Sequence, residues 1–406
     1  MLNKFLFKRI DNAPLIVFRV VFGLLLFVES VGAIFTGWVR RTFIEPEFTF
    51  NFIGFDFLQP LPGYGMYICF ALMGGFGLLV MIGYKYRWSL AGFTMMWTGV
   101  YLMQKASYNN HYYLLILLCL LMLALPANRY FSVDARRRPD KRSVSMPQWC
   151  SWVIILQVWI VYTYAAAAKL YPDWLDLSVA EDLMAARSDY PVIGGLLQQR
   201  WAHIGIAYFG IVFDFLIVPM LLWKPARKAA FLASVFFHLF NSVVFQIGIF
   251  PYMSLAFTLF FFAPETIRNL FLRKKPLYTA GEVAVTGNRN LMLGIGMIWF
   301  FIQVALPLRH WFIKGDVLWT EEGHRMSWRM MLRTKYGSIT FKIVDKDKGT
   351  SVMINPKERL SPKERNIIAT NPDVIWQFAQ RLKKEYALKG QDVAVYALSK
   401  ISVNGR

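Results

Sequence analysis

Three groups of polar residues interrupt long apolar stretches of this 406-residue sequence. Asn110 and His111 lie between two apolar stretches, Lys169 follows four consecutive alanines, and His238 precedes Asn241 by one helical turn. Ionisable and amide side chains are costly inside a bilayer, so each group is a candidate functional site. Removal from water favours the uncharged form of a lysine, which is a base, and an imidazole can hydrogen-bond an oxygen anion.

Each group also has a structural interpretation that needs no ligand. A lysine at a helix end often extends its amine to the membrane surface. A histidine and an asparagine one turn apart can hydrogen-bond across a bundle, and an Asn-His pair can cap a turn. Two further ionisable residues of the first apolar stretch, Arg19 and Glu29, would form an ion pair in this interpretation.

The composition is that of a membrane protein. Hydrophobic residues make up 56% of the chain and charged residues 17%, whereas an average soluble domain is about one quarter charged. The formal net charge of +20 could indicate a nucleic-acid partner. The basic residues lie largely between apolar segments, so we expect membrane lipid and no nucleic acid as a partner. Three cysteines within or beside apolar runs suggest no metal site.

We expect an α-helical polytopic membrane bundle over residues 1–306 and a small mixed α/β domain over residues 307–406. A helix needs roughly 20 apolar residues to cross the hydrocarbon core. About nine segments meet or approach this length, with eight as the alternative count. The candidate transmembrane segments are residues 14–36, 64–83, 88–104, 112–126, 149–169, 203–223, 228–247, 249–264 and 290–306.

Basic residues give the expected orientation, because cytoplasmic loops are enriched in Lys and Arg. With a cytoplasmic N-terminus and alternating crossings, most basic residues of the loops fall inside. The loops outside then hold only Arg40, Arg41, Lys105, Arg187 and Arg200. The same alternation makes the C-terminal domain extracytoplasmic and brings the three polar groups towards that face.

The C-terminal domain should contain strand pairs and helices. Residues 338–344 alternate and are rich in β-branched side chains, residues 345–349 form a turn, and residues 351–354 resume as a strand. A helix of about 16 residues should follow Asn371-Pro372, and residues 393–401 should form a final strand.

The order and spacing of several short motifs resemble those of the vitamin K-dependent γ-glutamyl carboxylase family, within the wider group of HTTM-domain membrane proteins. The resemblance is carried by residues 107–114, 168–170, 173–174, 238–242, 247–252, 326–331 and 354–356. It implies an enzyme, a γ-glutamyl carboxylase and quinol epoxidase of the carbon-carbon lyase type. Reduced vitamin K or menaquinol, oxygen and carbon dioxide would be consumed, and no metal is required.

The resemblance also implies roles for individual residues. A lysine base deprotonates the hydroquinone, oxygen adds, and the resulting strong base removes a proton from the γ-carbon of a peptidyl glutamate, which carbon dioxide then traps. The implied catalytic residues are Lys169, His111 and Asn110, with Asn110 holding the imidazole of His111. The implied ligand contacts are His238 and Asn241 for the quinone and Ser327, Trp328, Met330 and Met331 for the peptide glutamate.

Other expectations concern substrates and location. Arg187, an outside cation close after Lys169, is a candidate for binding carbon dioxide or a carboxylate. The compact length suggests a bacterial homologue in the inner membrane that uses a menaquinol-like reductant and a secreted glutamate-containing peptide or protein. The alternative is a non-catalytic quinone- or lipid-binding membrane protein. A transporter is less favoured, since no paired interrupted half-helices or inverted repeats occur.

Overall fold

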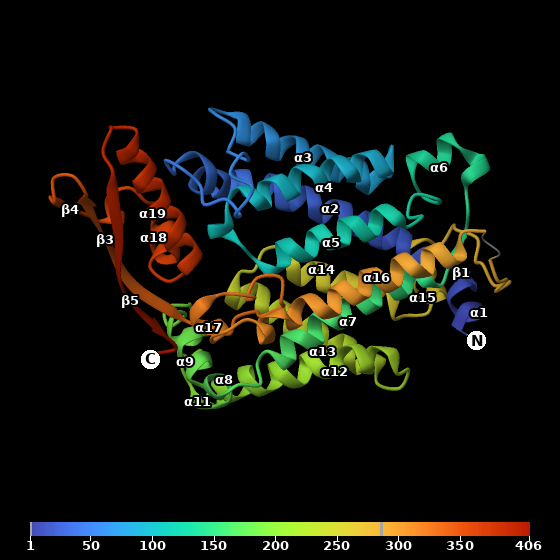
Figure 1. Ribbon diagram of the computed structural model, residues 1–406. Coiled ribbons are helices and arrows are strands. Elements are labelled where there is room, and N and C mark those ends of the chain that lie inside the picture. Colours follow the sequence, from blue (N-terminus) through green and yellow to red (C-terminus); the bar gives the residue numbers. More distant parts are fainter. Residues whose placement is uncertain (1, 285–286) are drawn as a thin grey trace.

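The computed structural model describes residues 2–284 and 287–406 as an elongated helical bundle with a small domain at one end (Figure 1). The N-terminal helix α1 (Leu2–Phe7) lies at the opposite end of the bundle from the strands of that domain. The two ends of the chain therefore lie at opposite ends of the molecule.

Each of the nine apolar segments forms a helix. Inside a bilayer no water is available to the backbone, so a single segment satisfies its N–H and C=O groups by hydrogen-bonding within itself. These helices are α2 (Ala13–Phe35), α3 (Gly65–Ile82), α4 (Tyr86–Met103), α5 (Asn110–Ala124), α7 (Trp149–Ala167), α11 (Arg200–Ile204) continuing through η4 (Gly205–Phe209) into α12 (Gly210–Leu222), α13 (Arg227–Phe245), α14 (Phe250–Phe257) with η5 (Thr258–Phe260), and α16 (Arg289–Leu308).

Six of these helical segments are long and apolar enough to cross a membrane. They comprise α2, α3, α7, the α11–α12 segment, α13 and α16 with the residues that follow it. Helices α5 and α14 are shorter, and α4 is not among the six. The predicted helical membrane protein is confirmed, whereas nine crossings are not.

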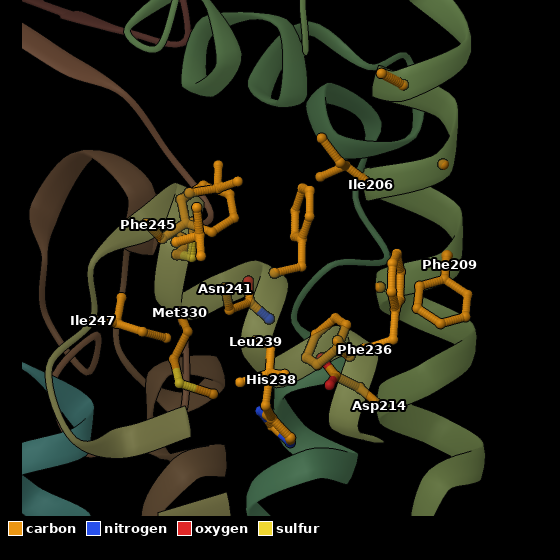
Figure 2. Close-up of a pocket in the computed structure, with 18 of the residues that line it drawn as sticks. Ile206, Phe209, Asp214, Phe236, His238, Leu239, Asn241, Phe245, Ile247 and Met330 are labelled. Atoms are coloured by element: carbon orange, nitrogen blue, oxygen red, sulfur yellow. The ribbon is translucent and has the colours of Figure 1, made fainter. Parts of the chain in front are cut away.

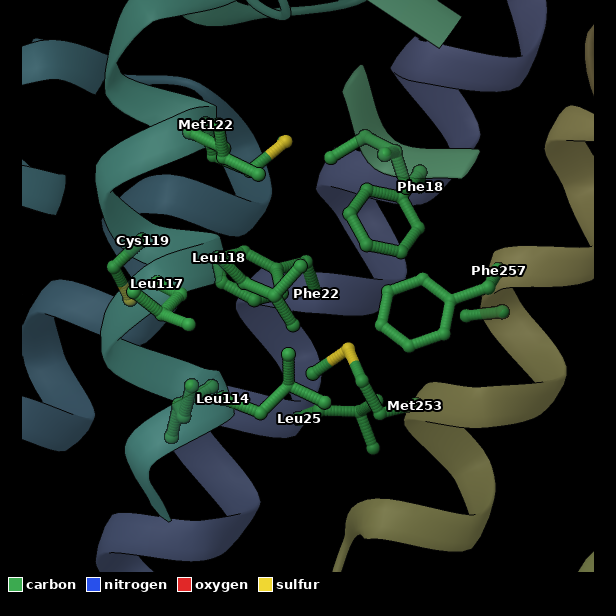
Figure 3. Packing of buried hydrophobic residues seen from close by; sticks show 14 of the residues in the cluster. Phe18, Phe22, Leu25, Leu114, Leu117, Leu118, Cys119, Met122, Met253 and Phe257 are labelled. Carbon is green, nitrogen blue, oxygen red and sulfur yellow. The ribbon is translucent and has the colours of Figure 1, made fainter. Parts of the chain in front are cut away.

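The helices differ in how far they are buried. In the most apolar window of α2, 56% of residues are buried, compared with 11% in α16. Helix α2 is therefore central and α16 peripheral. Figure 3 shows the centre of the bundle, where Phe18 and Phe22 of α2 meet Leu118 of α5 and Phe257 of α14.

Small residues allow α2 and α3 to approach closely. A Cβ atom added at Gly77 of α3 would lie 2.6 Å from the backbone nitrogen of Phe27 in α2. Backbones can come this near only where a side chain is absent, as is usual at close helix crossings in membranes.

The end of the bundle that carries the N-terminus is fastened by a short sheet and a buried ion pair. Strand β1 (Arg9–Asp11) pairs antiparallel with β2 (Ser145–Pro147). Lys275 Nζ lies 2.6 Å from Asp11 Oδ2, with both side chains buried. The short helices of this end are α6 (Val133–Arg137), η3 (Pro139–Lys141) and α15 (Pro264–Phe271).

The expected pair of Arg19 with Glu29 does not form. The guanidinium of Arg19 instead donates hydrogen bonds to the carbonyl oxygens of Ala127 and Phe131. These carbonyls follow α5, so Arg19 fastens a loop to α2 rather than pairing within the helix.

The C-terminal domain has the predicted strand and helix order. Its sheet has the order β4-β3-β5, with β3 (Lys335–Asp345) antiparallel to both β4 (Ser351–Ile354) and β5 (Val393–Val403). Helices α18 (Pro362–Ile368) and α19 (Pro372–Ala387) pack beside it (Figure 1). Alternate β3 residues face these helices, so Phe341 packs against Phe378 of α19.

The remaining short helices lie in the connections. They are η1 (Arg40–Ile44), η2 (Lys105–Ser107), α8 (Pro172–Leu175), α9 (Ser178–Ala185), α10 (Gly194–Leu197), η6 (Arg309–Phe312), α17 (Val317–Thr320) and η7 (Pro356–Glu358).

We expect the Gly77→Val substitution to destabilise the bundle by about 1–3 kcal/mol, because the added side chain would push α2 and α3 apart. Thermal unfolding of the purified protein in lipid nanodiscs would measure the loss. Gly75→Val on the same helix is the matched control, since its Cβ would meet nothing within 4 Å. Equal unfolding temperatures for the two variants would contradict the role of Gly77.

Candidate active site

A cavity of about 940 Å3 lies among α7, α12 and α13, near the end of the bundle that faces the C-terminal domain. Its lining is almost entirely apolar, with a few polar groups. Figure 2 shows Asp214, His238, Asn241 and Met330 around the interior. A concave apolar site with a few convergent polar groups is the usual form of a small-molecule site.

The structure brings six of the predicted site residues into this cavity and leaves four outside it. The lining includes His111, Lys169, His238, Asn241, Met330 and Met331. The residues that do not line it are Asn110, Arg187, Ser327 and Trp328. Within the described residues, no group of three or more His, Cys, Asp or Glu side chains is arranged to hold a metal ion.

Lys169 lies in the turn that follows α7, where Pro172 begins α8 and prevents the helix from continuing. Its amine is buried and lies 2.5 Å from Oδ2 of Asp214, which comes from α12. The same amine is 5.7 Å from the ring centroid of Trp174. Two charges in an apolar cavity are tolerated only as a well-formed pair, so Lys169 and Asp214 depend on each other.

The two cavity histidines each keep a ring nitrogen unbonded. His238 Nε2 lies 2.9 Å from the hydroxyl oxygen of Tyr162, while its Nδ1 is buried with no hydrogen-bond partner in the described part of the chain. His111 stacks on Phe250 with centroids 3.8 Å apart, and its Nδ1 is likewise buried and unpartnered. Buried polar atoms are normally satisfied, so these nitrogens are suited to binding a polar ligand atom.

Asn110 does not hold the imidazole of His111, contrary to the role that the resemblance implied. Its side-chain oxygen accepts a hydrogen bond from the hydroxyl of Tyr108, at 2.7 Å. Its amide donates to the carbonyl of Arg329 over 3.2 Å. Asn110 therefore joins the start of α5 to the segment that carries Met330 and Met331.

Residues 326–331 combine buried anchors with strained backbone. Trp328 is 1% exposed and stacks on Tyr113 of α5, with centroids 5.2 Å apart, so it belongs to the core of the bundle. Met326, Trp328 and Met331 have φ values of 57°, 56° and 55°. Non-glycine residues in this left-handed region are uncommon and persist where the surroundings enforce them. The strained segment places Met330 and Met331 in the cavity wall.

Ser327 supports this segment from behind. Its hydroxyl accepts a hydrogen bond from Arg309 at 3.2 Å and donates one to the carbonyl of Gly323 at 2.5 Å. Ser327 is 2% exposed, so it can reach a ligand only if this segment moves.

Arg187 is bound by backbone carbonyls rather than directed into the cavity. Its guanidinium donates to the carbonyls of Leu183 and Val244, at 3.1 Å and 3.3 Å, and packs over the ring of Phe245. These contacts join α9 to the end of α13, which is a structural role. The predicted binding of carbon dioxide or a carboxylate by Arg187 has no support from this geometry.

The cavity opens sideways through the outer face of α13. Leu232, Phe236 and Val243 line it, yet they are 66%, 65% and 59% exposed on the bundle surface. Because α13 is one of the six membrane-crossing candidates, this side of the cavity lies on a face that a membrane would cover.

The C-terminal domain is joined to the bundle by an ion-pair network around a partly buried aspartate. Asp373 at the start of α19 accepts from Lys105, at 2.7 Å, and from Arg325, at 2.8 Å. Burial acts to raise the pKa of Asp373, but hydrogen bonds and charges from Arg325 and Lys105 hold it below its ordinary value. Burial lowers the pKa of Lys105, an effect that Asp373 partly offsets.

A second set of contacts joins the last strand to the segment after Lys169. Asn404 donates to Asp173 Oδ2 at 2.8 Å, and Arg406 also pairs with Asp173. The hydroxyl of Tyr171 donates to the carbonyl of Leu332. The position of Lys169 is therefore set by the C-terminal domain as well as by α7.

Sequence reasoning did not select Asp214 as a site residue. One signal was available, since Asp214 is the only charged residue of the apolar helix α12. Asp373 gave no such signal, because an aspartate in the first turn of a soluble-type helix is ordinary.

The fold and the cavity define a helical integral membrane protein with a small α/β domain against its site. Residues 7–265 match the HTTM domain, and residues 288–406 match the lumenal domain of vitamin K-dependent gamma-carboxylase. No solved structure matches the chain. The chain belongs to the vitamin K-dependent gamma-carboxylase family, and the resemblance found in the sequence is confirmed.

We expect Asp373→Asn to loosen the C-terminal domain by roughly 3 kcal/mol, because two cations would lose their shared carboxylate. Since the folded-state pKa of Asp373 is lowered, its contribution is fully present above about pH 3.9 and is lost as the pH falls through the lowered value. Hydrogen exchange in residues 104–110 and in the first turn of α19 would measure the loosening.

The matched control is Asp392→Asn, which removes an exposed pair with Lys346. Exposed pairs contribute little, so exchange should stay as in the wild type. Wild-type exchange in Asp373→Asn would contradict the proposed domain contact.

Proposed function

We propose that this protein is a γ-glutamyl carboxylase that couples the oxidation of a reduced naphthoquinone by oxygen to the carboxylation of a peptidyl glutamate. The observation that carries the proposal is the buried amine of Lys169 in an apolar cavity that the lumenal domain helps to close. Family membership supports the reaction class, and the residues around Lys169 suit its chemistry.

The cavity suits a flat, lipid-soluble ring. Its apolar walls match a naphthoquinone, and its open side on α13 offers access from the bilayer. The unpartnered Nδ1 atoms of His111 and His238 are suited to hydrogen-bonding the ring oxygens, with Asn241 one turn further along α13. When bound, the reduced naphthoquinone supplies, together with oxygen, the strong base that carboxylation requires.

Lys169 has the role of removing the hydroxyl proton from the bound quinol at Nζ. His111 and His238 hold the oxygen that develops negative charge, since a positioned donor stabilises such charge most strongly in dry surroundings. The sideways opening admits lipid rather than water, which protects a reactive base from being quenched.

The peptide glutamate would approach from the side of the lumenal domain. Met330 and Met331 form the wall there, while Ser327 and Trp328 hold the segment in place. Carbon dioxide, a small apolar molecule, needs no dedicated cation in such a cavity.

We place the N-terminus in the cytoplasm and the C-terminal domain outside, in the inner membrane of a bacterium with menaquinol as reductant. The basic residues of the loops support this orientation. The substrate would then be a secreted glutamate-containing peptide or protein.

The decisive experiment compares the wild type with Lys169→Ala in lipid nanodiscs supplied with reduced vitamin K, oxygen, labelled bicarbonate and a glutamate-rich peptide. We expect the wild type to form epoxide and labelled peptide. Both products should fall by about 10²–10⁴-fold in Lys169→Ala, the usual contribution of a general base. Lys224→Ala is the control, because Lys224 is an exposed lysine outside the cavity.

Each outcome points to one function. Epoxide without labelled peptide would support quinol chemistry with a different acceptor. Quinone binding without either product, in a folded wild type, would instead favour a non-catalytic quinone- or lipid-binding protein.

A further inference from the structure

The carboxylate of Asp214 is the second half of the Lys169 site. Among the described residues that line the cavity, Lys169 and Asp214 are the only two that carry opposite full charges, and no arginine is present. Their side chains are 10% and 6% exposed, and the amine nitrogen lies 2.5 Å from Oδ2. This geometry is that of an ammonium that donates to a carboxylate, in which each charge compensates the other.

A protonated amine has three donor hydrogens and no lone pair. Lys169 can therefore take a proton from a substrate only if it gives one of its own away. The hydrogen bond to Asp214 is the one route that the described contacts of Lys169 offer.

We propose that Asp214 is the final acceptor of the proton that Lys169 removes from the substrate hydroxyl, an inference that rests on the proposed function. One N–H bond of Lys169 breaks first, and its proton bonds to Asp214 Oδ2, which frees the lone pair of Nζ. The O–H bond of the substrate then breaks, and its proton bonds to that lone pair. No electron is transferred. Asp214 is thus a positioning residue that acts through Lys169.

The exchange conserves charge in a dry site. Before the step, the ammonium faces the carboxylate of Asp214. After it, the ammonium faces the substrate oxyanion, while Asp214 is neutral. One ion pair replaces another, so no net charge develops in the apolar cavity, where an unpaired charge would be costly.

Other titratable groups near the pair do not replace Asp214 in this role. Tyr162 of α7 is engaged with His238 of α13 through a 2.9 Å hydrogen bond, and His111 of α5 is stacked on Phe250. These groups flank the pair without a described hydrogen bond to Lys169 or Asp214.

The Lys275–Asp11 pair, whose side chains are also buried, differs from the Lys169–Asp214 pair in how the lysine is hydrogen-bonded. Lys275 Nζ donates to Asp11, to the carbonyl of Val144 at 3.0 Å and to that of Pro276 at 3.2 Å. All three of its hydrogens are used, as expected of a structural pair. Lys169 Nζ, by contrast, has Asp214 as its one hydrogen-bond partner in the described chain, which leaves donor capacity for a ligand.

The test compares Asp214→Asn and Asp214→Glu with the wild type in nanodiscs. With reduced vitamin K and oxygen, epoxide formation should fall by about 10²–10⁴-fold in Asp214→Asn and should recover substantially in Asp214→Glu. Quinone affinity should change much less than turnover, because the cavity walls are unchanged.

A second readout needs no turnover. Acetylation of Lys169 by acetic anhydride at neutral pH, measured by mass spectrometry of the digested protein, should increase in Asp214→Asn because loss of the counter-ion favours the uncharged amine. Unchanged labelling would overturn the proposal. So would increased labelling with epoxide formation at or above the wild-type level, since Lys169 alone would then be a sufficient base.

Asp11→Asn is the matched control, because it breaks a buried lysine-aspartate pair at the other end of the bundle. Folded Asp11→Asn protein should form epoxide and label at Lys169 like the wild type. A fall of epoxide formation in this control equal to that in Asp214→Asn would overturn the proposal. A wild type that forms no epoxide would contradict the proposed function, while the labelling readout would still decide whether Asp214 controls the proton on Lys169.

Discussion

An ammonium group in an apolar cavity requires a counter-ion, and this requirement fixes how the helices around Lys169 are arranged. The amine comes from the turn after α7 and the carboxylate from α12, so the pair forms only when the two helices pack in one register. Helices α7 and α12 are in direct contact, and α13 closes the third side. The cavity is thus defined by the same packing that makes the charge tolerable.

The C-terminal domain completes the site as well as covering it. Trp328 is inserted into the core of the bundle, and its neighbours Met330 and Met331 form part of the cavity wall. Asp373 is held by Lys105 from the bundle and by Arg325 from the domain side. The positions of the cavity wall and of the domain are therefore coupled through the buried Trp328 and the partly buried ion pairs of Asp373.

Much of this arrangement could be predicted from the sequence. Apolar length located the helices, alternation located β3, and the cost of polar groups in lipid selected His111, Lys169 and His238. Partnerships between helices could not be predicted, because hydropathy does not say which helices touch, and so Asp214 was not assigned to Lys169. The left-handed backbone at Trp328 could not be predicted either. Tertiary packing imposes this conformation, which turns the Trp328 side chain into the core.

The lipid-facing opening along α13 has a consequence for how occupancy of the cavity is determined. In a membrane, acyl chains would lie against the exposed side chains of Leu232, Phe236 and Val243, and a ligand entering here would exchange with a lipid tail rather than with water. Saturation then depends on the mole fraction of the ligand within the bilayer, not on its bulk concentration. Dilution with additional lipid would act as competition, and the acyl composition of the membrane becomes a determinant of apparent affinity.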